Sequence, residues 1–318
     1  MKMSNFNESA SNLTLGLIDQ NTPMKASLIV TPSIVFLYVN GVMIFTLRKK
    51  AVFQEMSRYI LFGHMLWVDT LSLIFSLSVY ICAVCRFLII RNICLLLLVS
   101  AKALFHVSIL NLSLMSLERY VAICFPLRHA EFTSFKITHT AIVVVWVLGL
   151  IQCLSEVIIF YSFDSANTVL NSFCTRIILF RLQIYKSIDI AFTCIFFVLV
   201  SFVIIFTYAS IAAVAKTAAC DKLSAKKANK TVLLHLIQLG LGAMSILVGV
   251  VQEAIYLSTN YLTAINVMYF CFVVFIVFPK CLSPLIYGMR DQAFCCLFKY
   301  YFTFGKGKVK PVLIELHV

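Results

Sequence analysis

Seven long apolar segments account for most of this 318-residue chain. Each is long enough to cross a hydrocarbon core of about 30 Å as a helix. Hydrophobic residues make up 62% of the chain and charged residues 12%, which leaves too little polar surface for a soluble protein of this length. The segments are unbroken, which favours helices over the short alternating strands of a membrane barrel. The sequence therefore predicts an all-α fold, a seven-transmembrane helix bundle, with spans near 26–47, 59–82, 93–118, 137–161, 184–213, 231–257 and 264–287.

The distribution of basic residues predicts how this bundle is oriented. Alternate connections and the C-terminal tail carry most of the Lys and Arg, including Lys216 to Lys230, and such segments stay in the cytosol. The N-terminus is then outside, which agrees with glycosylation sequons at Asn7 and Asn12. Topology also explains the net charge of +13, so no nucleic-acid partner is expected. The expected domains are an extracellular tail (1–25), the seven-transmembrane bundle (26–289) and a cytoplasmic helix and tail (290–318).

A short amphipathic helix is expected after the seventh span. Its apolar residues recur at helical spacing, which predicts that it lies on the inner leaflet and contacts membrane lipid. Cys295 and Cys296 then sit at the lipid boundary, either as palmitoylation sites or as unmodified thiols. The apolar positions are Phe294, Leu297, Phe298 and Tyr301.

Charged residues close the third span, in the stretch MSLERYVAICFPLR from Met115 to Arg128. Glu118 directly precedes Arg119 and Tyr120. An arginine at a membrane boundary needs a partner or access to water. Ion-paired charges in this place can hold one state of a switch and release it.

These strings resemble the rhodopsin-like (class A) G protein-coupled receptors. MSLERYVAICFPLRH is similar to the odorant-receptor form MAYDRYVAICHPLRY, and SPLIYGMRDQ to that family's NPLIYSLRN. RYILFGHMLWVDT and KTVLLHLIQLGLG look most like fish odorant receptors. Departures are Ser283 in place of the expected Asn, a fifth span without proline, and a sixth span without the usual motifs.

The resemblance implies roles for several residues. Arg119 pairs with Glu118 at rest and faces a heterotrimeric G protein when active, beside Tyr120. The resemblance places three more residues at the end of the bundle that faces the G protein. They are Tyr208 in FTYASI and Pro284 and Tyr287 in PLIY.

The resemblance also implies a disulfide between Cys94 and Cys174. An oxidising outer compartment would let the bond persist. Cys82 and Cys85 are also near the outer face, so pairing with them stays open.

A buried polar cluster is expected in the middle of the bundle. Asn40 and Asp69 match the wider class, where this Asp helps to hold a sodium ion. A carboxylate at this depth needs compensation. Lys280 can neutralise Asp69 and replace sodium, with Ser108 completing the cluster. Alternatively, Lys280 points into the ligand site.

The outer halves of the spans hold an unusual set of charged residues. They are expected either to form structural ion pairs, such as Lys102 with Glu156 or Glu253, or to bind a polar, water-borne ligand. An acid would suit Lys102, and an amine would suit Glu253 or Asp189. The set is Lys102, His106, Glu156, Asp189 and Glu253.

The resemblance thus predicts an odorant receptor that binds a small-molecule odorant and activates a heterotrimeric G protein. Its place would be the plasma membrane, as a multi-pass protein in the cilia of olfactory sensory neurons. A non-olfactory receptor for a small amine or peptide is the alternative. A transporter would favour internal repeats and broken helices, and an enzyme would need a catalytic constellation; neither pattern is visible. No cofactor or metal site is expected.

Overall fold

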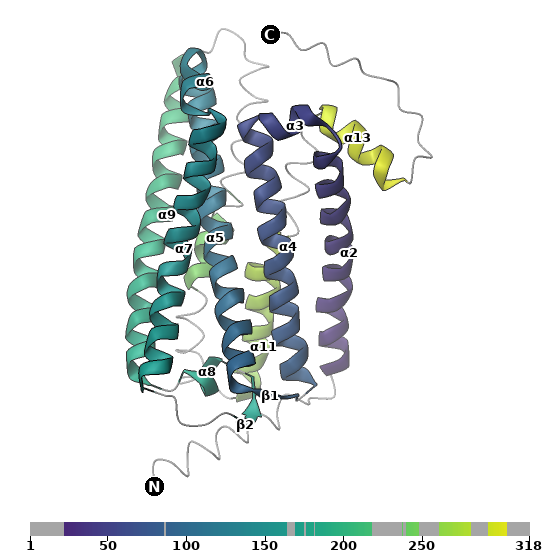
Figure 1. The fold of residues 1–318 in the computed structure, drawn as a ribbon, viewed down its shortest axis with the longest axis vertical. Helices are drawn as coiled ribbons and strands as arrows, with labels where there is room; N and C mark the ends of the chain where they lie inside the picture. The colour runs from purple at the N-terminus through teal and green to yellow at the C-terminus, as the bar shows by residue number, and fades with distance from the viewer. Residues whose placement is uncertain are drawn as a thin grey trace.

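The computed structural model describes residues 22–85, 87–163, 169–174, 176–180, 182–217, 237, 240–247, 261–280 and 292–303. The described chain is a bundle of long helices that run along a common axis (Figure 1). Short elements lie at its two ends. We call these the β end, which holds β1, β2 and α8, and the α6 end, which holds α3, α6 and α13.

Five of the described helices are long and apolar enough to cross a membrane. They are α2 (Thr22–Arg48), α4 (Ser57–Val84), α5 (Arg91–Cys124), α7 (Phe135–Phe163) and α9 (Gln183–Thr217). Each covers one of the first five expected spans.

The last two expected spans are described in part. Of the sixth, residues 237 and 240–247 are described. The seventh begins as α11 (Tyr261–Cys271), continues as the π-helix η2 (Phe272–Val277) and is described as far as Lys280. The π-helical turn was not expected from the sequence, because apolar composition does not distinguish it from an α-helix.

The boundary of α5 differs from the prediction in a way that matters for the site. We expected Glu118 and Arg119 to end this span, yet the helix continues to Cys124. The pair therefore sits inside a regular helix, more than one turn before its end.

Short elements join the long helices at each end. At the α6 end, α3 (Ala51–Glu55) follows α2, and η1 (Pro126–Arg128) with α6 (His129–Phe132) follows α5. At the β end, β1 (Leu88–Ile90) pairs antiparallel with β2 (Val169–Phe173), and α8 (Arg176–Leu179) follows. This two-stranded sheet departs from the all-α expectation, and it ties the α4–α5 connection to the α7–α9 connection.

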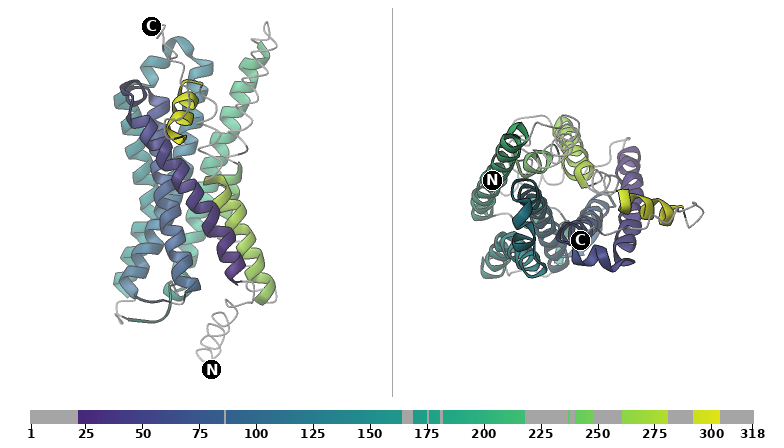
Figure 2. Two further views of the ribbon diagram at one scale, coloured as in Figure 1. Left: turned by 90° about the vertical axis from the view of Figure 1, so that its right-hand side faces the viewer. Right: turned by 90° about the horizontal axis from the view of Figure 1, so that it is seen from above.

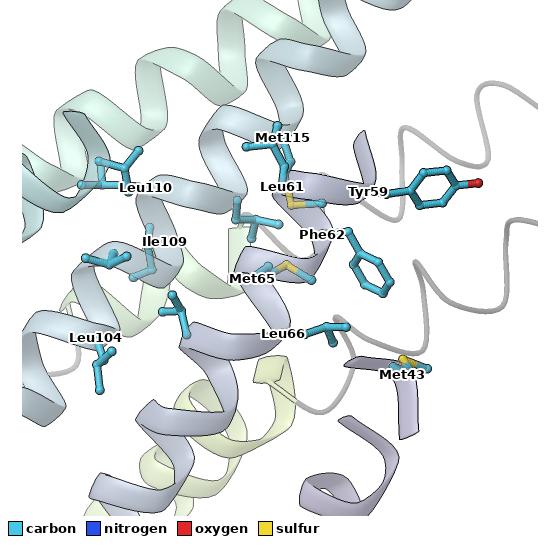
Figure 3. Packing of buried hydrophobic residues seen from close by; sticks show 14 of the residues in the cluster. Met43, Tyr59, Leu61, Phe62, Met65, Leu66, Leu104, Ile109, Leu110 and Met115 are labelled. Atoms are coloured by element: carbon cyan, nitrogen blue, oxygen red, sulfur yellow. The ribbon is translucent and has the colours of Figure 1, made fainter. Parts of the chain in front are cut away.

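Helix α5 is the central element of the bundle. It contacts α4, α7 and α9, while α2 packs on the far side of α4; the end-on view in Figure 2 shows this arrangement. Buried apolar side chains from these helices form a large core cluster, shown in part in Figure 3, beside two smaller clusters. Other large apolar residues are exposed, such as Phe202, Ile205 and Ile158, as expected for helices whose outer faces contact lipid.

Gly149 lets α7 approach α5 closely. A Cβ atom at this position would lie 2.6 Å from Val107 Cγ2 and 3.3 Å from the Val107 backbone nitrogen. Small residues at helix contacts permit this kind of packing in membrane bundles.

The C-terminal helix α13 (Gln292–Phe302) packs against α2, α3 and α4. Phe294 and Phe298 are buried, and the Phe294 ring lies edge-on to Phe62 with centroids 5.7 Å apart. The predicted apolar face therefore exists and lies partly on protein. Cys295 is half-buried and Cys296 exposed, and palmitoylation of either stays a prediction.

Candidate functional site

A disulfide anchors α5 at the β end. Cys94 and Cys174 are bonded, with Cα atoms 5.5 Å apart, and both are fully buried. The bond fixes the start of α5 to the segment that follows β2, and it confirms the expected pairing. Cys82 and Cys85 are free thiols, so the alternative pairing is wrong.

An ion pair lies near the other end of the same helix. Arg119 Nε is 3.5 Å from Glu118 Oε2, and the Glu118 side chain is buried. Glu118 lies about 36 Å along the helix axis from Cys94, at about 1.5 Å per residue. The Tyr120 ring packs edge-on against Phe206 of α9, with centroids 5.1 Å apart. Tyr120, the residue after Arg119, thus lies where α5 and α9 meet.

The remaining predicted residues of this end are less fully described. Tyr208 lies on α9 with an exposed side chain. Pro284 and Tyr287 lie outside the described residues.

His129 is a member of this ion-paired group that we did not expect. Its Nε2 atom is 3.4 Å from Glu118 Oε1, and its Nδ1 atom is 3.2 Å from Thr133 Oγ1. The Thr133 hydroxyl also donates to the His129 carbonyl oxygen at 2.6 Å. Glu118 therefore lies between two basic side chains, Arg119 on its own helix and His129 on α6.

A signal for His129 was present in the sequence. The odorant-receptor form of the motif ends in tyrosine where this chain has His129. Glu118 and His129 are 11 positions apart and meet because the chain turns through η1.

The expected polar cluster forms between α4, α5 and the described end of the seventh span. Lys280 Nζ lies 3.9 Å from Asp69 Oδ1, and both side chains are buried. Ser108 donates a hydrogen bond to Asp69. Lys280 also donates to Ser72, one turn from Asp69, which we did not expect. Lys280 is therefore oriented toward the cluster and not toward the β end.

Asn40 lies at the edge of this cluster. Its amide Nδ2 donates to Thr70 Oγ1 at 3.2 Å and so joins α2 to α4. Asn40 therefore contacts Thr70, the neighbour of Asp69 in sequence, and its described hydrogen bond does not go to the Asp69 carboxylate.

A larger charged cluster lies toward the β end. Lys102 Nζ is 2.6 Å from Glu156 Oε1, and Lys102 also forms an ion pair with Asp189. These residues come from α5, α7 and α9 respectively. The structure thus brings together three of the five residues of the predicted outer set.

Arg176 and Gln152 complete this cluster, and neither was predicted to belong to it. Arg176 Nη2, from α8, is 2.8 Å from Glu156 Oε1 and 3.2 Å from Asp189 Oδ1. Gln152 Nε2 donates to Asp189 Oδ1 at 2.8 Å. Gln152 lies one helical turn before Glu156, and this spacing was the sequence signal that the two side chains are neighbours. Arg176 follows the disulfide-bonded Cys174 by two residues, and that closeness was the signal for it.

The charges of this cluster compensate one another. Burial lowers the pKa of the Arg176 guanidinium, but the carboxylates of Glu156 and Asp189 raise it more, so its pKa is raised overall. Arg176 is therefore a permanent cation that links the loop helix to two long helices.

Of the other two predicted residues of the outer set, the structure describes His106 and not Glu253. His106 lies one turn from Lys102 on α5, is buried and stacks on Phe196 with ring centroids 4.6 Å apart. Glu253 lies outside the described residues.

Comparisons with known proteins agree with this architecture. Residues 39–287 match the family described as "7 transmembrane receptor (rhodopsin family)". The chain is 33% identical to "Odorant receptor 131-2" of Danio rerio, over 95% of each chain. It is 27% identical to "Olfactory receptor 2A1/2A42" of Homo sapiens, over 58% of this chain and 60% of that one. The chain belongs to the rhodopsin family of seven-transmembrane receptors and, within it, to the odorant receptors.

Proposed function

We propose that this chain is an odorant receptor that crosses the plasma membrane seven times. The N-terminus is extracellular, so the β end faces outward and the α6 end faces the cytosol. Residues 1–25 are the outer tail, 26–289 the receptor domain and 290–318 the cytoplasmic helix and tail. A small, polar, water-borne odorant binds in the outer bundle, and the receptor then activates a heterotrimeric G protein.

The observation that supports this proposal is the construction of α5. One end is fixed by the Cys94–Cys174 disulfide. The other carries Arg119, held beside a buried Glu118. Lys102 lies between them and contacts two other helices through its ion pairs. A ligand that disturbs these pairs therefore acts on the helix that carries the signalling arginine.

The mechanism is a shift between two populations. Ligand binding favours the state in which the inner ends of spans five and six move away from α5, so that a G protein can contact Arg119, Tyr208 and Tyr287. Moving a resting ratio of about 1:99 to about 99:1 requires ~5.5 kcal/mol of differential affinity. A small ligand rarely supplies this much, so we expect weak potency and partial activation.

The remaining assignments follow the same topology. Asn7 and Asn12 carry glycans on the outer tail, and Cys295 and Cys296 carry palmitoyl groups at the inner leaflet. The receptor then acts in the cilia of olfactory sensory neurons and raises cyclic AMP through a stimulatory G protein.

A cyclic-AMP assay tests this function. Cells that express the epitope-tagged receptor are exposed to pooled amino acids, amines, bile acids and nucleotides. At least one pool should raise cyclic AMP, and Arg119→Ala should abolish the response at equal surface expression. Uptake of a compound into cells that survives Arg119→Ala would instead support a transporter and overturn the proposal.

A further inference from the structure

The two carboxylates of the outer charged cluster are not equivalent. Glu156 is fully buried and contacts nitrogen atoms of Lys102, Arg176 and Gln152. Asp189 retains 26% of its side-chain exposure, and Arg176 retains 35%. Their contact, at 3.2 Å, is the longest of the four ion pairs within the described part of the cluster. The cluster is therefore easiest to open between Asp189 and Arg176.

A buried acceptor lies beside this contact without a partner. Gln152 is fully buried, and its Nε2 donates to Asp189. Its Oε1 atom has no hydrogen-bond partner among the described residues. A buried carbonyl oxygen left unpaired is unfavourable. The Gln152 side-chain amide is hydrogen-bonded to the Asp189 carboxylate through Nε2. A ligand group with several N–H bonds can therefore donate to both the Asp189 carboxylate and Gln152 Oε1.

Separating Asp189 from Arg176 leaves an anion and a cation each short of one contact. A ligand with a single charge can restore only one of these contacts. A ligand that carries an ammonium and a carboxylate on neighbouring atoms restores both, and it leaves the charge balance of the cluster unchanged.

We propose that this receptor recognises zwitterions of the α-amino-acid type at the opening between Asp189 and Arg176. The ligand's ammonium group donates to Asp189 and Gln152 Oε1, and its carboxylate accepts from the Arg176 guanidinium. Arg176 is the partner that moves, because it reaches the site from the short loop helix α8, whereas Asp189 is carried by α9. This inference rests on the proposed function, and it names the chemical class of the ligand.

Direct binding tests the proposal without relying on signalling. The purified full-length receptor is heated in the presence of each natural amino acid at millimolar concentration. For every amino acid that stabilises it, the methyl ester, which is a cation, and the N-acetyl derivative, which is an anion, are compared. We expect the zwitterion to bind about tenfold or more tightly than either, because each derivative loses one charge-assisted contact.

Two variants separate recognition from a merely structural role. In Arg176→Gln, the zwitterion should lose its advantage over the methyl ester. In Asp189→Asn, it should lose its advantage over the N-acetyl derivative. Ser187→Ala is the matched control, because Ser187 is exposed on the same helix as Asp189 and bonds only to its own helix among the described contacts. A general loss of folding would weaken all three ligands alike and would not produce this selective pattern.

The possible results discriminate clearly. Failure of every amino acid to stabilise the wild-type receptor overturns the proposal, as does equal binding of zwitterion, ester and N-acetyl derivative. If another ligand class raises cyclic AMP in an Arg119-dependent way, the ligand assignment fails while the receptor function stands. If amino acids bind but Arg119→Ala leaves the cellular response intact, the ligand assignment stands while the coupling mechanism fails.

Discussion

Replacing Lys280 with methionine removes the internal cation of a buried carboxylate. Lys280 Nζ lies 3.9 Å from Asp69 Oδ1, and the two side chains are almost fully buried, at 7% and 2% exposure. Removing one partner of a buried ion pair typically costs about 3–5 kcal/mol. We use the lower end, about 3 kcal/mol, because the separation is long and Asp69 keeps the hydrogen bond from Ser108.

This cost translates into a measurable change in thermal stability. Domains of about 150–250 residues lose about 2–4 °C per kcal/mol, and the lower figure suits a larger chain. Lys280→Met should therefore lower the unfolding midpoint of the purified receptor by about 6 °C, measured at one scan rate. Adding Asp69→Asn removes the unpaired charge, so the double variant should be more stable than the less stable single variant.

The effect of sodium on the unfolding midpoint is an independent test of the pairing between Lys280 and Asp69. The wild-type midpoint should be equal in sodium and choline chloride, because Lys280 already neutralises Asp69. Lys280→Met should gain stability in sodium specifically. Ser78→Ala is the control, because Ser78 is a half-buried residue of α4 that bonds only to Ile74 among the described contacts. A double variant no more stable than the worse single variant would refute the pairing.

Three further perturbations test other parts of the structure. Gly149→Ala should destabilise the purified receptor by about 1–3 kcal/mol in thermal unfolding, because a methyl group there overlaps α5; Gly41→Ala, whose Cβ meets nothing within 4 Å, is the control. His129→Ala should raise basal cyclic AMP, because it removes a contact that helps to hold Glu118 in place beside Arg119. His129→Tyr, which can still donate to that carboxylate, should stay near wild type. Equal basal cyclic AMP in the wild type and both variants would contradict a restraining role for His129. Cys94→Ser should reduce surface expression, since losing a native disulfide typically costs about 2–5 kcal/mol of stability. Normal surface expression with an unchanged unfolding midpoint would contradict a stabilising role of the Cys94–Cys174 disulfide.

The sequence was most informative about features along the membrane axis. Apolar length placed the five described spans, and resemblance located the Cys94–Cys174 bond. The pairing of Asp69 with Lys280 followed from the resemblance, which places the middle of span seven beside the middle of span two, and from the cost of an unpaired buried charge. Depth is readable from sequence because the bilayer fixes the length of a span.

Lateral contacts were harder to predict. His64 contacts Asn111 at 3.0 Å and accepts a hydrogen bond from Trp146 at 2.9 Å, joining α4, α5 and α7. Nothing in their spacing indicates this network, because it depends on how each helix is rotated. Arg176 was missed for a related reason: its position depends on how the disulfide and the β1–β2 sheet fold the loop over the bundle.

Activation of a G protein through Arg119 can be measured directly. Membranes from cells expressing the receptor are mixed with purified heterotrimeric G protein, and nucleotide exchange is measured with a ligand identified by binding. Ligand should accelerate exchange with wild-type membranes and not with Arg119→Ala membranes that hold the same amount of receptor. Ligand-dependent exchange of equal rate in both would contradict it.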